Sequence, residues 1–250
     1  MKQNKELEYY QKTKDWDFDM FEIESEKLTN WDFYEVLRKV SDKNSRILDL
    51  GTGGGEKVLK HFPECKEILG TDYLEEMIDT AKKNLEKSGR KNISFRLMDN
   101  LKMDVPENYY DVVTARHTTT DPKQIYKCLN SGGYLLIRGV EDKDDCYSLK
   151  LTFGRGQGFD AEKSISLIDY ENVLNAGFKD VELIPLYERE YFKNKYLFKK
   201  FLEKAPIISA FENLEEVIDD KLLDSYIRDN TFNGKIRILR RYYGIIAKKK

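Results

Sequence analysis

A glycine-rich turn directly after an apolar strand constrains this chain more than any other feature. Residues 47–56 read ILDLGTGGGE, so the apolar run ends at Gly51 and leads into a loop that contains Gly53, Gly54 and Gly55. Because glycine has no β-carbon, the loop can turn tightly and approach a ligand closely before the next helix presents its N-terminal amides. This arrangement predicts a nucleotide-like ligand at the carboxyl end of the strand.

The segments that follow alternate between short apolar runs and helical patterns. This alternation is typical of βαβ units and predicts a doubly wound, Rossmann-like α/β fold with a seven-stranded, mostly parallel sheet and an antiparallel last strand. We predict the seven strands at residues 45–50, 67–72, 93–98, 110–115, 134–140, 181–187 and 237–246.

Two segments outside the alternating strands and helices are also expected to be helical, one before the first strand and one before the last. Residues 1–44 mix charged and aromatic side chains and predict two helices that form an N-terminal lid over the site, with Tyr9, Tyr10 and Trp16 as its apolar surface. Residues 192–234 predict a helical insertion before the last strand. The main domain then spans residues 45–250.

Composition narrows the classes of partner. The chain has 43 Lys and Arg against 45 Asp and Glu, a net charge of -2, which disfavours a dominant affinity for nucleic acid. Its three cysteines lack CxxC spacing and it has two histidines, so we expect no metal site. We find neither a secretory signal nor an apolar stretch long enough to span a bilayer, and we expect a cytoplasmic protein without membrane contact.

A carboxylate accompanies the glycine loop. Asp72 closes the second predicted strand roughly 20 residues after Gly51, where it can accept hydrogen bonds from both hydroxyls of a ribose. A nicotinamide dinucleotide and S-adenosylmethionine both satisfy this pair of signals. Two residues favour S-adenosylmethionine: Glu56 takes the position where the dinucleotide fingerprint needs Gly or Ala, and the carboxylate of Asp49 suits a cationic ligand.

With these residues, the chain resembles the class I S-adenosylmethionine-dependent methyltransferases, particularly the ubiquinone/menaquinone-biosynthesis-like small-molecule subgroup. The resemblance covers about residues 45–140 and rests on five motifs in the family's order. The motifs are LDLGTGGG at 48–55, GTD at 70–72, MDN at 98–100, YDVV at 110–113 and LNSGGYL at 129–135.

The resemblance implies roles for individual residues. Gly51 and Gly53 would face the methionine part of the cofactor, and Asp49 would hold its ammonium group. Asp72 would bind the ribose. The full cofactor-binding set that we predict is Asp49, Gly51, Thr52, Gly53, Asp72, Tyr73, Met77, Asp99, Asn100 and Ala115, in which Tyr73 lies beside the adenine and Asp99 accepts from the adenine amino group.

Two further residues are candidates for catalysis. His117, just after the fourth main strand, is the candidate general base, and Arg116 is the candidate anchor for an anionic acceptor. Residues 114–118 read TARHT rather than the (Asp/Asn)-Pro-Pro-aromatic motif found in enzymes that methylate exocyclic base amines, which argues against a nucleobase acceptor.

The leading prediction is methyl transfer from S-adenosyl-L-methionine to a small-molecule or peptide acceptor, with S-adenosyl-L-homocysteine as product, by a monomer or homodimer. An RNA or protein methyltransferase is the second reading, supported by the basic C-terminus. A nicotinamide-dependent oxidoreductase or an inactive adenosine-binding module is the third. The sequence leaves the acceptor atom open.

Overall fold

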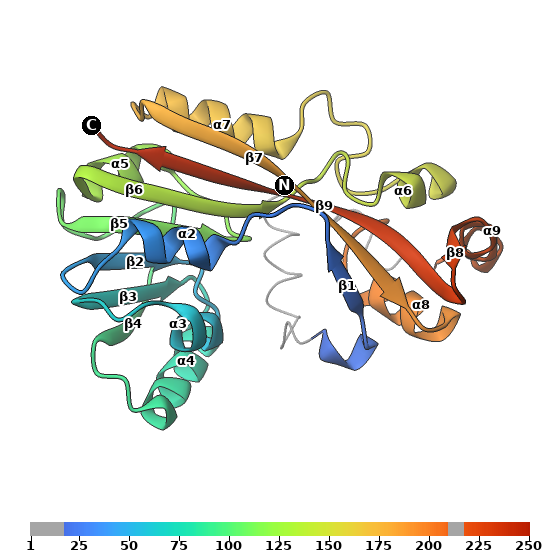
Figure 1. The fold of residues 1–250 in the computed structure, drawn as a ribbon, viewed down its shortest axis with the longest axis horizontal. Helices are drawn as coiled ribbons and strands as arrows, with labels where there is room; N and C mark the ends of the chain where they lie inside the picture. The colour runs from blue at the N-terminus through green and yellow to red at the C-terminus, as the bar shows by residue number, and fades with distance from the viewer. Residues whose placement is uncertain (1–17, 210–217) are drawn as a thin grey trace. The chain divides into compact units, whose positions relative to one another are not determined.

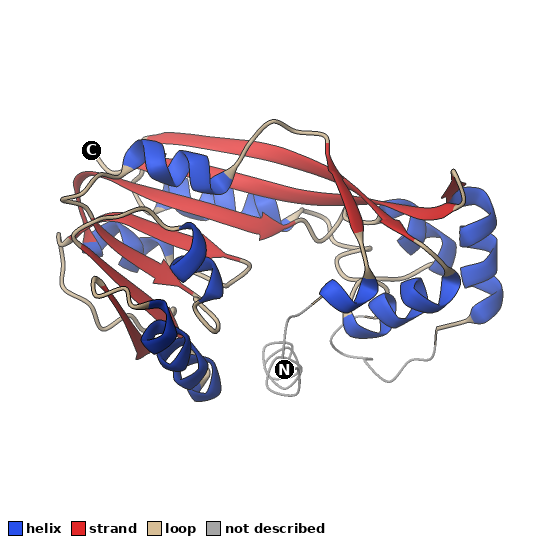
Figure 2. Ribbon diagram, turned by 60° about the horizontal axis from the view of Figure 1, so that its bottom comes forward, coloured by secondary structure: helices blue, strands red, loops and turns tan. Residues whose placement is uncertain are grey.

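The computed structural model describes residues 18–209 and 218–250, and Figures 1 and 2 trace its elements. The predicted aromatic lid residues Tyr9, Tyr10 and Trp16 lie outside the described residues. The helices are η1 (Asp19–Phe21), α2 (Phe33–Val40), α3 (Glu56–His61), α4 (Glu75–Ser88), α5 (Pro122–Cys128), α6 (Tyr147–Phe153), α7 (Ile165–Asn175), α8 (Lys195–Lys204) and α9 (Asp220–Asn230). The strands are β1 (Glu24–Lys27), β2 (Arg46–Leu50), β3 (Glu67–Asp72), β4 (Ile93–Leu97), β5 (Tyr110–Arg116), β6 (Leu129–Val140), β7 (Asp180–Phe192), β8 (Thr231–Phe232) and β9 (Lys235–Lys248).

The chain divides into two compact units. The glycine-loop unit comprises Trp31–Gly139, Ser166–Ile184 and Tyr243–Lys250. The second unit comprises the described residues of Met1–Asn30, Val140–Ile165 and Pro185–Tyr242. Among the described residues, we find no helix with the length and apolar character needed to cross a membrane.

The described strands form one nine-stranded sheet in the order β1-β7-β9-β6-β5-β2-β3-β4, with β8 paired to β9. The pairs β2–β3, β2–β5, β3–β4 and β5–β6 are parallel. Strand β9 runs antiparallel to β6, because Gly132 N–H donates to the Lys249 carbonyl whereas Glu141 N–H donates to the Arg241 carbonyl. The predicted α/β fold with an antiparallel last strand is therefore confirmed.

Two details of the prediction are wrong. The sheet has two strands more than the seven predicted, β1 and β8, and β1 replaces helix in part of the N-terminal segment. Strand β1 reads ESEK and all four residues are exposed, so it has no apolar alternation to reveal it. Its pairing with β7 is supported by Glu26, whose carboxylate accepts hydrogen bonds from Arg189 and Tyr191. Contacts between residues so far apart in the sequence leave no local sequence pattern from which β1 could be predicted.

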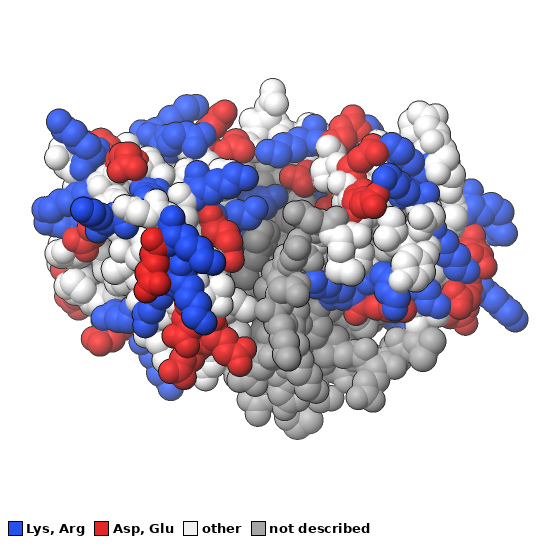
Figure 3. All heavy atoms as spheres, turned by 90° about the horizontal axis from the view of Figure 1, so that it is seen from below, with Lys and Arg blue, Asp and Glu red and all other residues white. Residues whose placement is uncertain are grey.

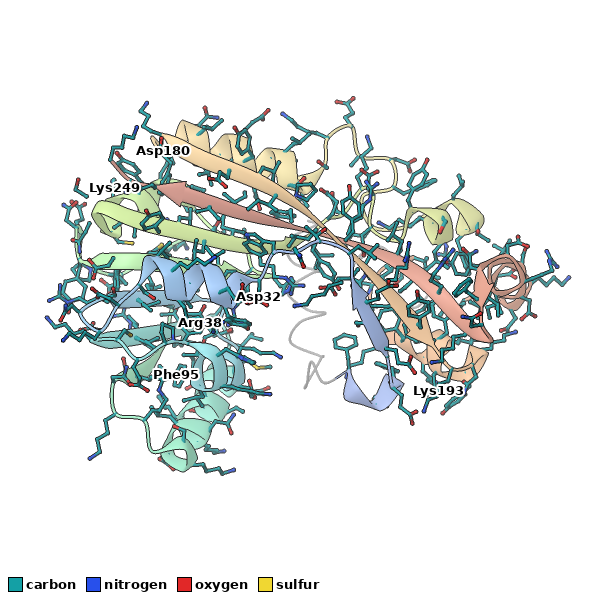
Figure 4. The ribbon with its side chains drawn as sticks, in the orientation of Figure 1. Asp32, Arg38, Phe95, Asp180, Lys193 and Lys249 are labelled. Carbon is teal, nitrogen blue, oxygen red and sulfur yellow. The ribbon has the colours of Figure 1, made fainter. Side chains whose placement is uncertain are left out.

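Close packing around the glycines fixes the core of the glycine-loop unit. A β-carbon at Gly55 would lie 2.6 Å from the ring of Phe95, and one at Gly70 would lie 2.7 Å from it. Phe95, which is labelled in Figure 4, therefore fills the space that the two missing side chains leave between the loop and β3. Protein cores are closely packed and have few voids. These two glycines are therefore needed because a side chain at either position would collide with Phe95.

A buried ion network lies in the core of the second unit. Arg240 Nε donates to both carboxylate oxygens of Asp145, at 3.0 and 3.1 Å, and its NH1 lies 3.4 Å from Glu190. All three residues are buried. Burial raises the pKa of Glu190, although Arg240 opposes this shift. The network packs against a cluster of aromatic residues that includes Phe192, Phe198 and Phe201.

We predict that Arg240→Met destabilises the protein by about 3–5 kcal/mol, because it leaves Asp145 and Glu190 buried without their cation. Urea unfolding measures this change. The matched control is Arg228→Met, since Arg228 pairs with Asp229 at 3.5 Å with both side chains largely exposed. We expect the control to change stability by less than about 1 kcal/mol. Equal effects of the two substitutions would contradict the account of the network.

Candidate functional site

The glycine loop connects β2 to α3 through backbone conformations that favour glycine. Gly51, Gly53 and Gly55 have φ values of 69°, 58° and 77°. Thr52 N–H donates to the Thr71 carbonyl at 2.8 Å and so ties the loop to the end of β3. A β-carbon at Gly53 would meet no atom of the described residues within 4 Å, apart from its chain neighbours, so this part of the structure leaves open space beside Gly53.

Asp72, the last residue of β3, lies against this loop. Its Oδ2 accepts from Gly53 N–H at 2.9 Å and its Oδ1 accepts from Leu74 N–H at 3.0 Å. A carboxylate oxygen can accept two hydrogen bonds, so each oxygen retains one position for a further donor. Two such positions side by side match the vicinal hydroxyls of a ribose. The structure therefore brings together the glycine and the acid that the sequence paired.

The site lies where the order of the strands reverses. Strands β3 and β4 follow β2 on one side, whereas β5 pairs with β2 on the other, with Leu50 opposite Ala115. Open α/β sheets bind ligands at the carboxyl ends of the strands that flank such a reversal. The glycine loop leaves β2 at this point, and β5 ends beside it at Arg116, which His117 follows.

Thr118 is a residue of the site that the sequence analysis missed. Its hydroxyl accepts from Asn100 Nδ2 at 3.0 Å, and a β-carbon at Gly51 would come within 2.6 Å of the Thr118 β-carbon. Asn100 Oδ1 is buried and has no partner among the described residues, so it can accept from a ligand. The signal in the sequence was a hydroxyl residue one position after His117, at the end of a strand.

Arg116 points into the glycine-loop unit. Its NH1 donates to the Tyr34 hydroxyl at 2.9 Å and its NH2 donates to Asp49 Oδ2 at 3.2 Å. The rings of Phe33, Tyr34 and Phe62 surround the guanidinium at 5.6–5.9 Å. Burial alone would lower the pKa of Arg116, but Asp49 and Tyr34 outweigh burial and raise the pKa above its ordinary value. Arg116 is therefore a permanent cation, and its role as acceptor anchor stays a prediction.

His117 is exposed and has a left-handed backbone, with φ of 54°. Its Nε2 lies 3.2 Å from NH1 of Arg138. Because arginine donates and never accepts, Nε2 must be the acceptor, which places the imidazole proton on Nδ1. His117 can act as a base through Nε2 once it gives up this hydrogen bond. Its predicted role in catalysis stays a prediction.

The remaining predicted residues differ in accessibility. Tyr73 follows β3 and is 52% exposed, and Met77 is half-buried on α4. Asp99 follows β4, where its Oδ1 accepts from Leu101 N–H at 2.8 Å. Thr52 and Ala115 are buried. The exposed Tyr73 is available to a ligand, whereas the side chain of Ala115 is fully buried in β5.

Comparison with known proteins identifies the family to which this chain belongs. The family described as a methyltransferase domain matches residues 41–169, just over half of the chain. The chain belongs to this methyltransferase family. The family match covers the glycine loop, Asp72 and the end of β5, so the class I S-adenosylmethionine-dependent methyltransferase resemblance is confirmed. The ubiquinone/menaquinone-like subgroup stays a prediction.

Several relatives share the matched segment. An uncharacterized methyltransferase, YcgJ of Bacillus subtilis, is 29% identical over 107 residues, which cover 40% of this chain and 42% of YcgJ. A protein-L-isoaspartate O-methyltransferase of Pyrococcus horikoshii is 30% identical over 106 residues, covering 41% of this chain and 48% of that protein. The chain thus spans less than half the length of these relatives.

Solved structures share the fold over a longer range. The crystal structure of Bacillus subtilis YcgJ has a TM-score of 0.58 at 18% identity, covering 87% of this chain and 97% of that chain. Haemonchus contortus phosphoethanolamine N-methyltransferase 2, solved with S-adenosyl-L-methionine, has a TM-score of 0.52 at 18% identity, covering 87% of this chain and 52% of that chain. These similarities confirm the Rossmann-like fold of this chain.

We predict that Gly51→Ala and Gly53→Ala differ in their effect on stability. Both substitutions place alanine in a left-handed conformation, at a cost of about 1–2 kcal/mol. Gly51→Ala also drives its β-carbon into Thr118, whereas the β-carbon of Gly53→Ala meets no atom of residues 18–209 and 218–250 beyond its chain neighbours. Thermal or urea unfolding should therefore show a larger loss for Gly51→Ala. Equal losses would mean that Thr118 does not pack against the loop as described.

Proposed function

We propose that this protein transfers a methyl group from S-adenosyl-L-methionine to a small-molecule or peptide acceptor and releases S-adenosyl-L-homocysteine. The observation that carries the proposal is the pairing of Gly53 with Asp72 at the strand reversal. Among residues 18–209 and 218–250, this pairing leaves open space beside Gly53 and one acceptor position on each oxygen of Asp72. Family membership supports the same assignment. It disfavours the nicotinamide-dependent alternative.

The residues present fit the cofactor. Asp72 offers both carboxylate oxygens to the ribose, and the open position at Gly53 admits a ligand close to the backbone. Asn100 Oδ1, which has no hydrogen-bond partner in the part of the chain that the structure describes, is an acceptor in the same site. Tyr73 and Asp99 follow the neighbouring strands β3 and β4, and we assign them to the adenine by the family resemblance.

The bound cofactor supplies a methyl group already activated by the sulfonium. The protein's task is then to orient the acceptor and to exclude water, and a base is needed only for some acceptors. Asp72 and the glycine loop fix the position of the donor. Where the acceptor must lose a proton, we assign this step to His117 Nε2 after its hydrogen bond with Arg138 opens.

The names of two similar proteins are compatible with a peptide or a small-molecule acceptor. The Pyrococcus horikoshii relative is named for protein-L-isoaspartate, and the Haemonchus contortus structure is of an enzyme named for phosphoethanolamine. The first points to a peptide carboxylate and the second to an amine of a small molecule. Both classes lie within the proposed range of acceptors.

The charges of the C-terminal strand support the same choice over RNA. Basic side chains of β9 and of the two residues after it pair with other residues of the chain: Arg240 with Asp145, Arg241 with Asp144, Lys249 with Asn108 and Lys250 with Asp180. Lys249 and Asp180 are labelled in Figure 4. On the face seen in Figure 3, basic and acidic side chains are interspersed. A phosphate backbone favours a concentrated basic surface instead.

The cofactor assignment predicts the behaviour of Asp72→Asn. This substitution keeps the size of the side chain but removes the charge, and we expect it to weaken S-adenosylhomocysteine binding about 10- to 100-fold. Titration calorimetry measures the affinity. The control is Asp79→Asn, since Asp79 is an exposed acid of α4, and its affinity should equal that of the wild type. Unchanged affinity of a folded Asp72→Asn protein removes the ribose assignment, and binding of NAD without response to S-adenosylhomocysteine removes the proposed function.

Labelled methyl transfer identifies the acceptor. We expect incubation of the protein with methyl-labelled S-adenosylmethionine and a cell extract to label a small-molecule or peptide fraction, which mass spectrometry then identifies. An Asp72→Asn reaction serves as the control for background labelling. Label that appears in RNA instead would overturn the proposed acceptor class while leaving methyl transfer intact.

A further inference from the structure

The sequence resemblance gives Asp49 a direct contact with the ammonium group of the cofactor, but the structure gives it other partners. We propose that Asp49 is a positioning residue, which shapes the cofactor site through a buried ion pair with Arg116 rather than by contacting the cofactor. This inference rests on the proposed function, because it concerns the same cofactor site. It adds Arg116 and Tyr34 to the residues that determine cofactor affinity.

The first argument is the burial of Asp49. The residue is 0% exposed, and both carboxylate oxygens already have partners. Thr114 Oγ1 donates to Oδ1 at 2.7 Å, and Arg116 NH2 lies 3.2 Å from Oδ2. A ligand on the surface of the loop therefore meets the backbone of the loop before it can reach this carboxylate.

The second argument is the position of Arg116. Its side chain is 11% exposed, its NH1 is bound by the Tyr34 hydroxyl, and three aromatic rings surround it. The ring of Tyr34 is in turn stacked on His61 of α3, with ring centroids 4.6 Å apart. If Asp49 turned to an external ammonium, the guanidinium would remain buried without its anion. Separating a buried pair in this way is strongly unfavourable.

The third argument is what the pair connects. Asp49 lies two residues before Gly51 on β2, and it is opposite Thr114 in the register with β5. Thr114 and Arg116 are two residues apart on β5, so their side chains lie on one face of the strand and both reach Asp49. The carboxylate therefore ties the end of β2 to the end of β5. These are the two strands from which the glycine loop and Thr118 emerge.

Two ligands distinguish a positioning role from direct contact. One is S-adenosylhomocysteine, and the other is its deamino analogue, in which hydrogen replaces the amine. We expect Asp49→Asn to lower the binding affinity for both ligands by the same factor, about 10-fold, as for the loss of a hydrogen-bonded charge. A loss confined to S-adenosylhomocysteine, with the analogue bound as tightly as by the wild type, would establish direct contact and overturn the inference.

Substitutions at Arg116 test whether its charge matters. Arg116→Met removes the charge and keeps an unbranched side chain. We expect it to lower the binding affinity for both ligands about as much as Asp49→Asn does. Arg116→Lys restores a cation beside Asp49, and we expect it to recover most of the affinity. A role in packing alone makes the Lys and Met variants equal, and that result contradicts the ion-pair account.

A milder substitution guards against loss of folding. Tyr34→Phe keeps the ring and removes the hydroxyl that Arg116 NH1 contacts, and we expect it to weaken both ligands equally, about 3- to 10-fold. The matched control is Tyr109→Phe, since the Tyr109 hydroxyl donates to Glu67 at the opposite end of β3, and its affinities should not change. Unchanged affinities in Tyr34→Phe overturn the inference. If the wild type itself fails to bind S-adenosylhomocysteine, the proposed function falls and this inference falls with it.

Discussion

The left-handed backbone of the glycine loop is the constraint on which the site depends. Positive φ at Gly51, Gly53 and Gly55 turns the chain from β2 into α3 within a few residues. The same turn directs the N–H of Gly53 at Asp72, and the absence of a side chain at Gly51 admits Thr118. One local conformation thus sets the distances between the ends of three strands. The buried pair of Asp49 and Arg116 holds two of those strands in place beneath the loop.

Local pattern was sufficient to predict the fold and the centre of the site. The central parallel strands β2 and β5 are buried on both faces and therefore appear as apolar runs, and the predicted 67–72 coincides with β3. The glycine loop and Asp72 are recognisable because both follow directly from such runs. Their contact across the loop follows from the adjacency of parallel strands, which the alternation of strands and helices already indicates.

Contacts between distant residues explain what the sequence could not reveal. The hydroxyl of Tyr34 meets Arg116 across 82 residues, and Asp49 meets it across 67. An arginine at the end of a strand has the same sequence pattern whether it faces a substrate or a buried carboxylate, so the direction of Arg116 became known only from the structure. Strand β1 is a similar case, because its charged residues are held by partners on β7 rather than by burial.

A crystal structure with bound S-adenosylhomocysteine tests the central claim most directly. The account predicts the ribose hydroxyls within hydrogen-bonding distance of both oxygens of Asp72, with the ligand passing over Gly53. It also predicts that Asp49 remains paired with Arg116 beneath the loop. An adenosine bound away from the carboxyl ends of β2 and β3, with Asp72 contacting the protein backbone alone, would contradict the account.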